Sequence, residues 1–200
     1  MNFTDGHSSS SPETKHNPPP STSTRVQVAA RFRPVNKTEA GLPDAPVCEF
    51  GLYNSSVLVD DPTRNQSFHF SFDHILNTDT TQNGCYRTVA SPLVDTVLSG
   101  INAAIIAYGQ TGSGKSYSMM GYGEDKGIIP RAVAKIFDRI SDTADATTTY
   151  HVECSMLEIY NEQIRDLFSS VPRNKMAKGG LKVRDSAATG PFVMGLTKNA

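Results

Sequence analysis

Short apolar segments separated by polar turns run along most of the chain, and their periods predict its secondary structure. At 25–33 apolar side chains recur at every second position, which predicts a strand that Pro34 ends. The same period predicts a strand at 68–72, whose three phenylalanines are expected in the core. A further short strand is expected at 57–59. The continuous apolar run 105–107 instead favours a strand buried on both faces of a parallel sheet.

Helical spacing first appears after Asp79 and Thr80, two plausible caps. Apolar residues between 86 and 98 then fall on one side of a helix. Pro92 is expected to bend this helix, and Gly100 is expected to end it.

A second helix is predicted to open at Lys115 and to be split by the polar, glycine-rich segment 121–127. It resumes with Pro130 near its first turn, because apolar residues between 129 and 140 recur at helical offsets. We interpret the inserted segment as a solvent-facing loop.

In the last third of the chain, the residue pattern predicts a strand at 150–160, a short helix at 161–168, and a flexible basic loop at 172–180. Two final strands are expected at 181–184 and 191–196. This alternation of strands and helices favours a three-layer α/β domain with helices on both faces of the sheet.

Composition changes this picture only at the N-terminus. Residues 1–24 are mostly Ser, Thr, Pro, Asn and His, so they cannot bury enough apolar surface to offset the entropy cost of ordering. We therefore expect a disordered tail before a domain at 25–200.

The formal net charge of −1 provides no overall field for binding nucleic acid. No segment approaches the roughly 20 apolar residues of a membrane span. The three cysteines are far apart, which favours reduced thiols in a cytoplasmic protein.

One glycine-rich segment, between the predicted strand 105–107 and the helix that follows, carries a recognisable chemical pattern. It fits G-x-x-x-x-G-K-[ST] at every defined position. Its residues are Gly109, Gln110, Thr111, Gly112, Ser113, Gly114, Lys115 and Ser116. The glycines let successive backbone N–H groups turn inward as an anion nest, and the helix N-terminus adds partial positive charge. Lys115 can reach the β- and γ-phosphates and the Ser116 hydroxyl can ligate Mg²⁺, so the pattern predicts binding of a nucleoside triphosphate.

Arg31 and Arg33 emerge at the end of the first predicted strand, beside the rigid Pro34. Exposed arginines are common, and taken alone the pair is typical of solvated charges at a sheet edge. Next to a phosphate-binding loop, Arg and Pro together can instead enclose an adenine ring. The residues alone leave both interpretations open.

Five segments resemble signatures of the kinesin motor domain and occur in the kinesin order. They are RFRP at 31–34, FSFDHIL at 70–76, LSGINAAIIAYGQTGSGKSYSMMG at 98–121, GIIPRAV at 127–133 and LEIYNEQIRDLF at 157–168. The resemblance is specific, because other P-loop classes do not combine this form of the loop with EIYNE. It implies a three-layer P-loop NTPase sheet with helices on both faces, incomplete at its C-terminal end.

The resemblance further implies an ATP-dependent microtubule motor with ATP and Mg²⁺ as ligands. Residues 109–116 would hold the phosphates, with Lys115 and Ser116 in catalytic roles and Ser116 on the metal. The adenine would be contacted by Arg31, Arg33, Pro34 and Tyr117. The inserted segment 121–127 would lie near the mouth of the nucleotide site.

The partner implied by the resemblance is the microtubule, and the expected location is therefore the microtubule cytoskeleton. Residues 181–196 are similar to the kinesin strand pair that approaches β-tubulin. The loop of this pair carries no basic residue, so contact through it would depend on Arg184 and on nearby lysines.

The kinesin family senses the γ-phosphate with a Ser-Ser-Arg segment and with a strand that ends in Asp, and neither is found in this sequence. The chain stops at Ala200, a little past the middle of a kinesin head. We therefore expect the 200-residue chain alone to be inactive and the full-length protein to be a microtubule-stimulated ATPase. The alternatives are a kinesin-like module that binds microtubules or a partner without cycling, and a metabolic P-loop kinase or other NTPase. No heptad run indicates an oligomeric state.

Overall fold

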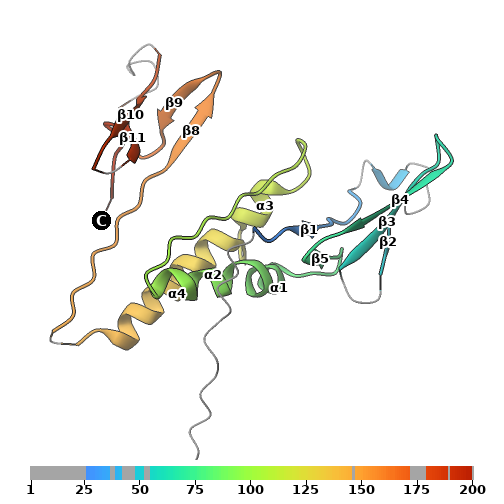
Figure 1. Cartoon of the computed structure of the whole chain (residues 1–200), viewed down its shortest axis with the longest axis horizontal. Coiled ribbons are helices and arrows are strands. Elements are labelled where there is room, and N and C mark those ends of the chain that lie inside the picture. The colour runs from blue at the N-terminus through green and yellow to red at the C-terminus, as the bar shows by residue number, and fades with distance from the viewer. Residues whose placement is uncertain are drawn as a thin grey trace, which may run out of the picture. The chain divides into compact units, whose positions relative to one another are not determined.

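The computed structural model describes residues 26–36, 39–41, 48–51, 55–145, 147–171, 179–188 and 190–199. The chain forms two compact units, Met1–Val133 and Ala134–Ala200. Figure 1 shows the helices and strands in the order of the chain. The tail predicted at 1–24 and the basic residues of the loop predicted at 172–180 lie outside the described residues.

Two small sheets form the strand part of the first unit. β1 (Ala29–Arg31) pairs in parallel with β5 (His74–Leu76). β2 (Cys48–Phe50), β3 (Ser56–Asp61) and β4 (Gln66–Ser71) form an antiparallel sheet in that order. The strands predicted at 57–59 and 68–72 are therefore confirmed, whereas β1 is shorter than the predicted segment because it extends only as far as its pairing with β5.

Of the three phenylalanines expected in the core, Phe68 and Phe70 of β4 are exposed, so the prediction was wrong for these two, and Phe72 is half-buried. Phe50 and Phe70 both lie opposite Val57, one on each neighbouring strand, so the three side chains share a face of the sheet. Val57 is buried with 1% of its surface exposed, whereas Phe70 is 46% exposed. The rings thus cover the central valine, but their own outer sides are open to solvent in the described part of the chain.

A single helical segment begins after Thr81, whose side-chain oxygen accepts a hydrogen bond from the Gly84 backbone N–H. The cap is therefore one residue later than predicted. The segment consists of α1 (Gln82–Cys85), a π-helical turn η2 (Tyr86–Ala90) and α2 (Ser91–Leu98). Pro92 lies just after the π turn, where its missing N–H is tolerated. Gly100 follows the end of α2 with φ of 96°, which supports its predicted role as a stop.

The main core cluster lies where this helical segment meets β5 and the start of α4 (Ile128–Thr143). Its buried members are Leu76, Cys85, Tyr86, Ala90 and Ile128. Partly buried hydrophobic residues pack around them, including Ile105 and Met119. The core therefore holds α1 and η2 close to the segment that leads into and out of the glycine-rich loop.

The strand predicted at 105–107 is not formed, and residues 101–109 have no regular secondary structure. Ile105 is partly buried against the core, but Ile106 is 87% exposed and Tyr108 is 97% exposed. A buried parallel strand needs hydrogen-bonding neighbours, and no described strand pairs with this segment. Its apolar sequence alone is not enough to make it a strand.

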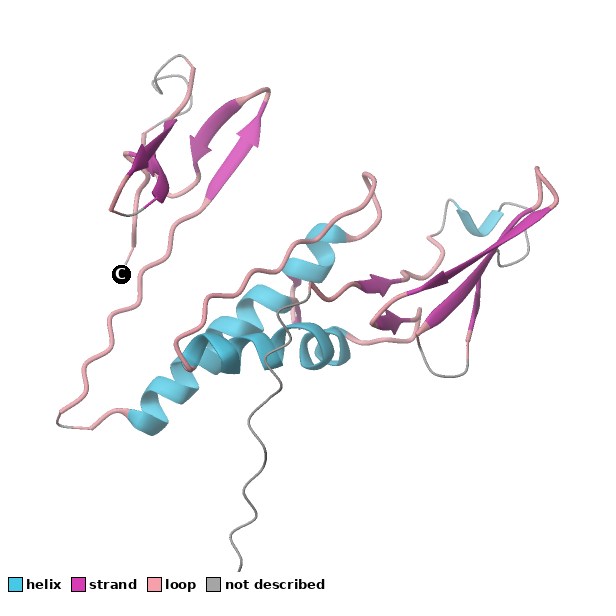
Figure 2. Cartoon of the chain, viewed as in Figure 1, coloured by secondary structure: helices cyan, strands magenta, loops and turns pink. Residues whose placement is uncertain are grey.

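The predicted split helix is confirmed (Figure 2). α3 (Lys115–Met119) ends before a two-stranded hairpin of β6 (Gly121–Tyr122) and β7 (Asp125–Lys126), and α4 follows with Pro130 in its first turn. Gly121 has φ of 76°, and a Cβ added there would lie 2.0 Å from the Asp125 carbonyl oxygen. Glycine is therefore required for the hairpin to close.

The second unit contains two antiparallel hairpins. β8 (Leu157–Tyr160) pairs with β9 (Gln163–Asp166), and β10 (Lys182–Ser186) pairs with β11 (Gly190–Met194). The second hairpin confirms the two predicted final strands, and β8 covers only the end of the strand predicted at 150–160. The helix predicted at 161–168 was wrong, because Asn161 and Glu162 have positive φ and turn the chain back on itself.

The predicted mixture of helices and strands is thus confirmed, but the described strands form five separate small sheets. A single sheet with helices on both faces is not assembled among the described residues. The strand expected at 105–107, at the centre of such a sheet, has no neighbour among the described strands. Also described is a single 3₁₀ turn, η1 (Glu39–Gly41), which contributes to the site below.

Candidate functional site

The glycine-rich loop curls tightly and ends at a helix, as its sequence predicts. Gly112 and Gly114 have φ of 80° and 98°, a left-handed conformation that glycine adopts without a steric penalty. The Ser113 backbone N–H donates to the Gln110 carbonyl oxygen at 3.2 Å, which closes a turn within the loop. Gly114 is the N-cap of α3, and its carbonyl accepts the first helical hydrogen bond from Ser118 N–H at 2.8 Å. Lys115 and Ser116 are consequently the first two residues of this helix.

The Lys115 side chain folds back onto this loop. Its Nζ donates to the carbonyl oxygens of Gly109 at 2.8 Å and Gln110 at 2.7 Å. Ser116, the next residue of α3, is exposed. The arrangement places one cation and one hydroxyl at the mouth of the loop, where phosphate oxygens could take the place of the two carbonyl oxygens around the ammonium group.

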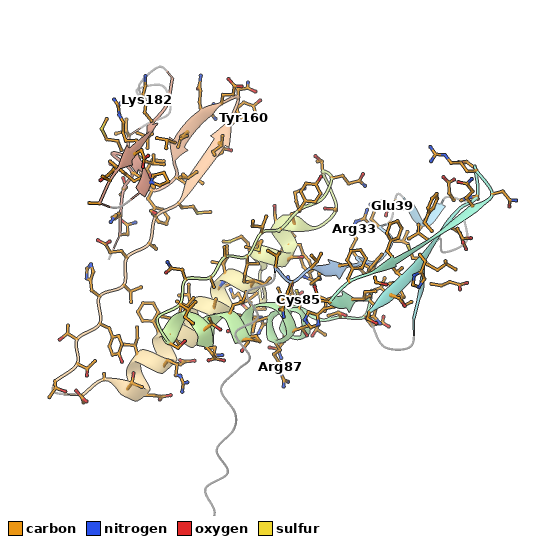
Figure 3. The ribbon with its side chains drawn as sticks, viewed as in Figure 1. Arg33, Glu39, Cys85, Arg87, Tyr160 and Lys182 are labelled. Carbon is orange, nitrogen blue, oxygen red and sulfur yellow. The ribbon has the colours of Figure 1, made fainter. Side chains whose placement is uncertain are left out.

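Arg33 connects the end of β1 to the loop and to η1. Its Nε donates to the Gly112 carbonyl oxygen at 3.1 Å, and its two terminal nitrogens contact the Glu39 carboxylate at 2.7 and 2.6 Å (Figure 3). This bidentate contact, followed by a hydrogen bond from Asn36 N–H, lowers the pKa of Glu39 to about 2. Nη1 of Arg33 also donates to the Pro34 carbonyl oxygen at 3.0 Å. The guanidinium is therefore fixed against the glycine-rich loop.

Arg31 is fixed as well, but by different partners. Its Nη1 donates to Gln82 Oε1 at 2.8 Å and to Ser118 Oγ at 2.9 Å. Its Cζ lies 5.2 Å from the centre of the Tyr117 ring, which is within the range of a cation–π contact. Both arginines therefore have specific hydrogen-bond partners in the structure.

Tyr117 joins α3 to the β6–β7 hairpin. Its hydroxyl donates a hydrogen bond to the Asp125 carboxylate, which raises the pKa of Tyr117. Its ring centre lies 5.8 Å from that of Tyr122 in the same hairpin. The inserted segment thus lies directly against one of the side chains that the resemblance assigns to the adenine.

The structure brings the predicted residues together in the first unit, around the N-terminus of α3. It also shows three contacts that the sequence pattern did not predict, made by Glu39, Gln82 and Asp125. Asn36 and Glu39 exchange side-chain-to-backbone hydrogen bonds in an N-x-x-E capping box, a pattern that could have identified Glu39. Gln82 lies four residues before Tyr86 on the apolar side of the helix, and a polar residue on that side was a signal of a buried partner.

Within the described ranges, no group of three or more His, Cys, Asp or Glu residues is placed to hold a metal ion. None of the helices described here has the length and apolar character needed to cross a membrane.

Comparison with protein families finds that the kinesin motor domain model matches residues 31–200. Kinesin-like protein KIF14 of Mus musculus is 37% identical over 182 residues, which cover 88% of this chain and 11% of that protein. Kinesin-related protein 1 of Dictyostelium discoideum is 38% identical over 196 residues, which cover 88% of this chain and 9% of that protein.

Solved structures give the same result. A KIF14 dimer with AMP-PNP in complex with a microtubule matches with a TM-score of 0.80 and 36% identity, covering 88% of this chain and 50% of that chain. A fast kinesin matches with a TM-score of 0.77 and 36% identity, covering 87% of this chain and 48% of that chain. The chain therefore spans about half the length of these solved structures and about a tenth of the curated relatives.

Proposed function

Because the chain belongs to the kinesin motor domain family, we propose that its glycine-rich loop binds ATP with Mg²⁺ and that ATP hydrolysis drives movement of the full-length protein along microtubules. The family match covers 31–200. The solved relatives with similar folds include a complex that contains both AMP-PNP and a microtubule.

The observation that carries the proposal is the bond between Arg33 and the Gly112 carbonyl oxygen. It joins the end of β1, where an adenine is expected, to the loop where the phosphates are expected. Arg31 makes a parallel connection from β1 to α3, through Ser118 and the Tyr117 ring. A base site and a phosphate site are thereby held next to each other by side chains that are far apart in the sequence.

The residues present fit a nucleotide with a magnesium ion. Gly112 and Gly114 have nothing within 4 Å of the position of an added Cβ, so the loop backbone is open to close approach. In this proposal the backbone N–H groups of residues 109–116 hold the phosphates, Lys115 neutralises their charge and the Ser116 hydroxyl holds Mg²⁺. The bound ion would supply charge neutralisation at the β- and γ-phosphate oxygens.

The base would lie against Arg31, Arg33, Pro34 and Tyr117. Arg31 and Tyr117 already stack on each other, so an adenine would extend an existing contact instead of ordering two loose side chains. The glycine-rich loop needs no rearrangement of its left-handed glycines for this role. Lys115 would exchange the Gly109 and Gln110 carbonyl oxygens for phosphate oxygens.

We further propose that residues 25–200 are the N-terminal portion of a motor domain whose complete form is a three-layer sheet with helices on both faces. The five separate small sheets, and the apolar segment 101–109 that pairs with no described strand, support this proposal because a single sheet is not assembled among the described residues. Because the sheet is incomplete, the 200-residue chain alone would not turn over ATP. Residues 1–24 would be a tail outside the domain.

The proposed partner is the microtubule, with a location on the cytoskeleton in the cytoplasm. The β10–β11 hairpin is the candidate contact in this chain, because Lys182 and Arg184 lie two residues apart on one face of β10 and both are exposed. Two exposed cations on one face suit a negatively charged partner surface.

The test of the nucleotide site is Lys115→Ala in the full-length protein. Loss of the ammonium should weaken ATP binding and slow turnover by about 100-fold or more, because one charge-bearing donor at a phosphate site contributes that much. Fluorescent nucleotide binding, ATP turnover with microtubules, and filament gliding measure these effects. Lys198→Ala removes the same charge from an exposed pair with Glu153, and it should leave all three unchanged.

Unchanged gliding by Lys115→Ala would reject the motor assignment. A wild-type protein that binds microtubules but does not turn over ATP would instead be the non-cycling module.

A further inference from the structure

We infer that Gln82 is a positioning residue for the base site: it fixes Arg31 and Tyr117 relative to each other and thereby sets how much the adenine contributes to nucleotide affinity. The inference rests on the proposed function, because it assumes that Arg31 and Tyr117 contact the base. It assigns a role to a residue outside the glycine-rich loop and outside the predicted adenine contacts.

Gln82 is 1% exposed and is the first residue of α1. Both ends of its side-chain amide are hydrogen-bonded. Oε1 accepts from Arg31 Nη1 at 2.8 Å, and Nε2 donates to the Tyr117 backbone carbonyl oxygen at 2.6 Å. An amide in this position can bridge a cationic donor and a carbonyl acceptor, which no apolar side chain of similar size can do.

The bridge links three elements that are distant in sequence. Arg31 ends β1, Gln82 begins α1, and Tyr117 lies in α3, with 51 and 35 residues separating Gln82 from its two partners. The same two partners also stack on each other, with the Arg31 Cζ 5.2 Å from the Tyr117 ring centre. Gln82 therefore fixes the backbone of one member of the stack and the guanidinium of the other.

This placement has a chemical consequence. The plane of the Arg31 guanidinium and the plane of the Tyr117 ring determine where a flat base can stack. Without Gln82, Arg31 keeps its bond to Ser118 but loses one of two fixed acceptors, and the Tyr117 carbonyl oxygen loses its hydrogen bond from α1. Each binding event would then include the entropy cost of ordering Arg31 and Tyr117. The glycine-rich loop, which Gln82 does not contact, would keep its shape.

The experiment compares two probes in the full-length protein. ATP uses both the base site and the phosphate site, and inorganic tripolyphosphate uses only the phosphate site. For Gln82→Leu, with Mg²⁺ present, the Kd of ATP should rise about tenfold, since a hydrogen bond to a charged group is lost. The affinity for tripolyphosphate, measured by competition, should stay within about twofold of wild type, because Gln82 does not contact the glycine-rich loop. A twofold change corresponds to less than about 0.5 kcal/mol.

Thr81→Ala is the matched control for stability. It removes the N-cap of the same helix, one residue away, without touching Arg31 or Tyr117. It should lower the melting temperature but leave the ratio of ATP to tripolyphosphate affinity unchanged. A merely structural role for Gln82 would make Gln82→Leu behave like this control.

Gln82→Glu provides a second variant in case the leucine variant does not fold. A carboxylate still accepts from Arg31 but can no longer donate to the Tyr117 carbonyl oxygen. The affinity for ATP should fall by about threefold, between wild type and Gln82→Leu, again with little change for tripolyphosphate.

The outcomes separate the two proposals. If the wild-type protein binds tripolyphosphate and ATP equally well, the base site does not exist, and both this inference and the proposed adenine contacts are overturned. If wild type prefers ATP but both Gln82 variants keep that preference in full, only the role of Gln82 is overturned.

Discussion

At the scale of single residues, the site depends on a backbone shape that only glycine adopts easily. Gly112 has φ of 80°, and its carbonyl oxygen is the acceptor for Arg33. A Cβ added at this position would meet nothing within 4 Å. Any effect of a side chain there would consequently arise from the backbone and not from a clash.

We therefore expect Gly112→Ala to lower the free energy of unfolding by about 1–2 kcal/mol, the cost of a left-handed alanine. The same change should weaken ATP binding, because relief of that strain rotates the Gly112 carbonyl away from Arg33. Denaturant unfolding and nucleotide titration measure the two effects. Gly84→Ala is the control, since Gly84 lies within α1 at an ordinary helical φ, where alanine should be neutral or stabilising. Equal behaviour of the two variants would show that the loop does not keep its left-handed shape.

The Arg33–Glu39 pair predicts a pH dependence. The folded-state pKa of Glu39 is about 2, below its ordinary value of 4.5, and the first cause is the hydrogen bond from Arg33. A lowered pKa means that the ionised carboxylate stabilises the fold above pH 4.5 and that this contribution is lost as the pH falls from 4.5 towards 2. Glu39→Gln should therefore show a smaller loss of stability across this window than wild type.

Thermal unfolding at pH 7, 4.5 and 3 measures the difference between the two proteins. The Glu39→Gln variant should be less stable than wild type at pH 7, and the gap should narrow at pH 3. A gap that stays constant with pH would show that Glu39 titrates normally in the folded protein. Asp61 is a control because this residue lies outside the site. The pKa of Asp61 is also lowered, but its first cause is the hydrogen bond from the Thr63 hydroxyl.

At the scale of elements, the β8–β9 hairpin shows how a turn can replace an expected helix. Asn161 and Glu162 have φ of 48° and 59°, and they are the two residues between the strands. Two-residue hairpin turns with positive φ at both positions favour Asn followed by Gly. Glu162 is therefore in a conformation that its side chain makes costly.

Glu162→Gly should raise the free energy of unfolding by up to about 1 kcal/mol, because glycine removes the cost of the left-handed conformation. The control is Glu124→Gly, in the turn between β6 and β7, where φ is not positive. There glycine should only add disorder to the unfolded chain and should be neutral or destabilising. A destabilising effect of Glu162→Gly would mean that residues 161–168 do not form this hairpin.

The elements that the sequence predicted correctly are those determined by local signals. The glycine-rich loop, the start of α3 at Lys115, and the split before α4 all follow from glycine positions and helix-start signals within a few residues. Strand β4 follows from a period of two, and β3 contains the short apolar run 57–59. In each case the information lies inside the element itself.

The wrong predictions depend on distant partners. Residues 105–107 are as apolar as a buried strand, but a strand forms only where a neighbour supplies hydrogen bonds. The NEQIRDLF segment has acceptable helix formers, but pairing of Ile164 with Ile159 across the hairpin overrides that weak preference. The contacts of Gln82 with Arg31 and Tyr117 span 51 and 35 residues, so spacing along the chain could not reveal them.

At the scale of the whole molecule, the two proposed ligands are assigned to residues of different units. All the proposed nucleotide contacts lie before Val133, and the proposed microtubule contact Arg184 lies in β10 of the second unit. This division makes the two activities separable by mutation. Lys115→Ala should weaken nucleotide binding, whereas a change at Arg184 should affect only binding to the filament.

We expect Arg184→Ala in the full-length protein to weaken microtubule affinity about two- to fivefold and to reduce its dependence on salt, because one exposed charge at an interface mainly affects association. ATP binding without microtubules should be unchanged, because Arg184 is not one of the proposed nucleotide contacts. Co-sedimentation with microtubules at several salt concentrations, together with nucleotide titration, measures both. Lys198→Ala removes an equal charge from an exposed pair with Glu153 in the same unit, so it controls for net charge. Equal loss of filament affinity in the two variants would mean that overall charge, and not the β10–β11 hairpin, attracts the microtubule.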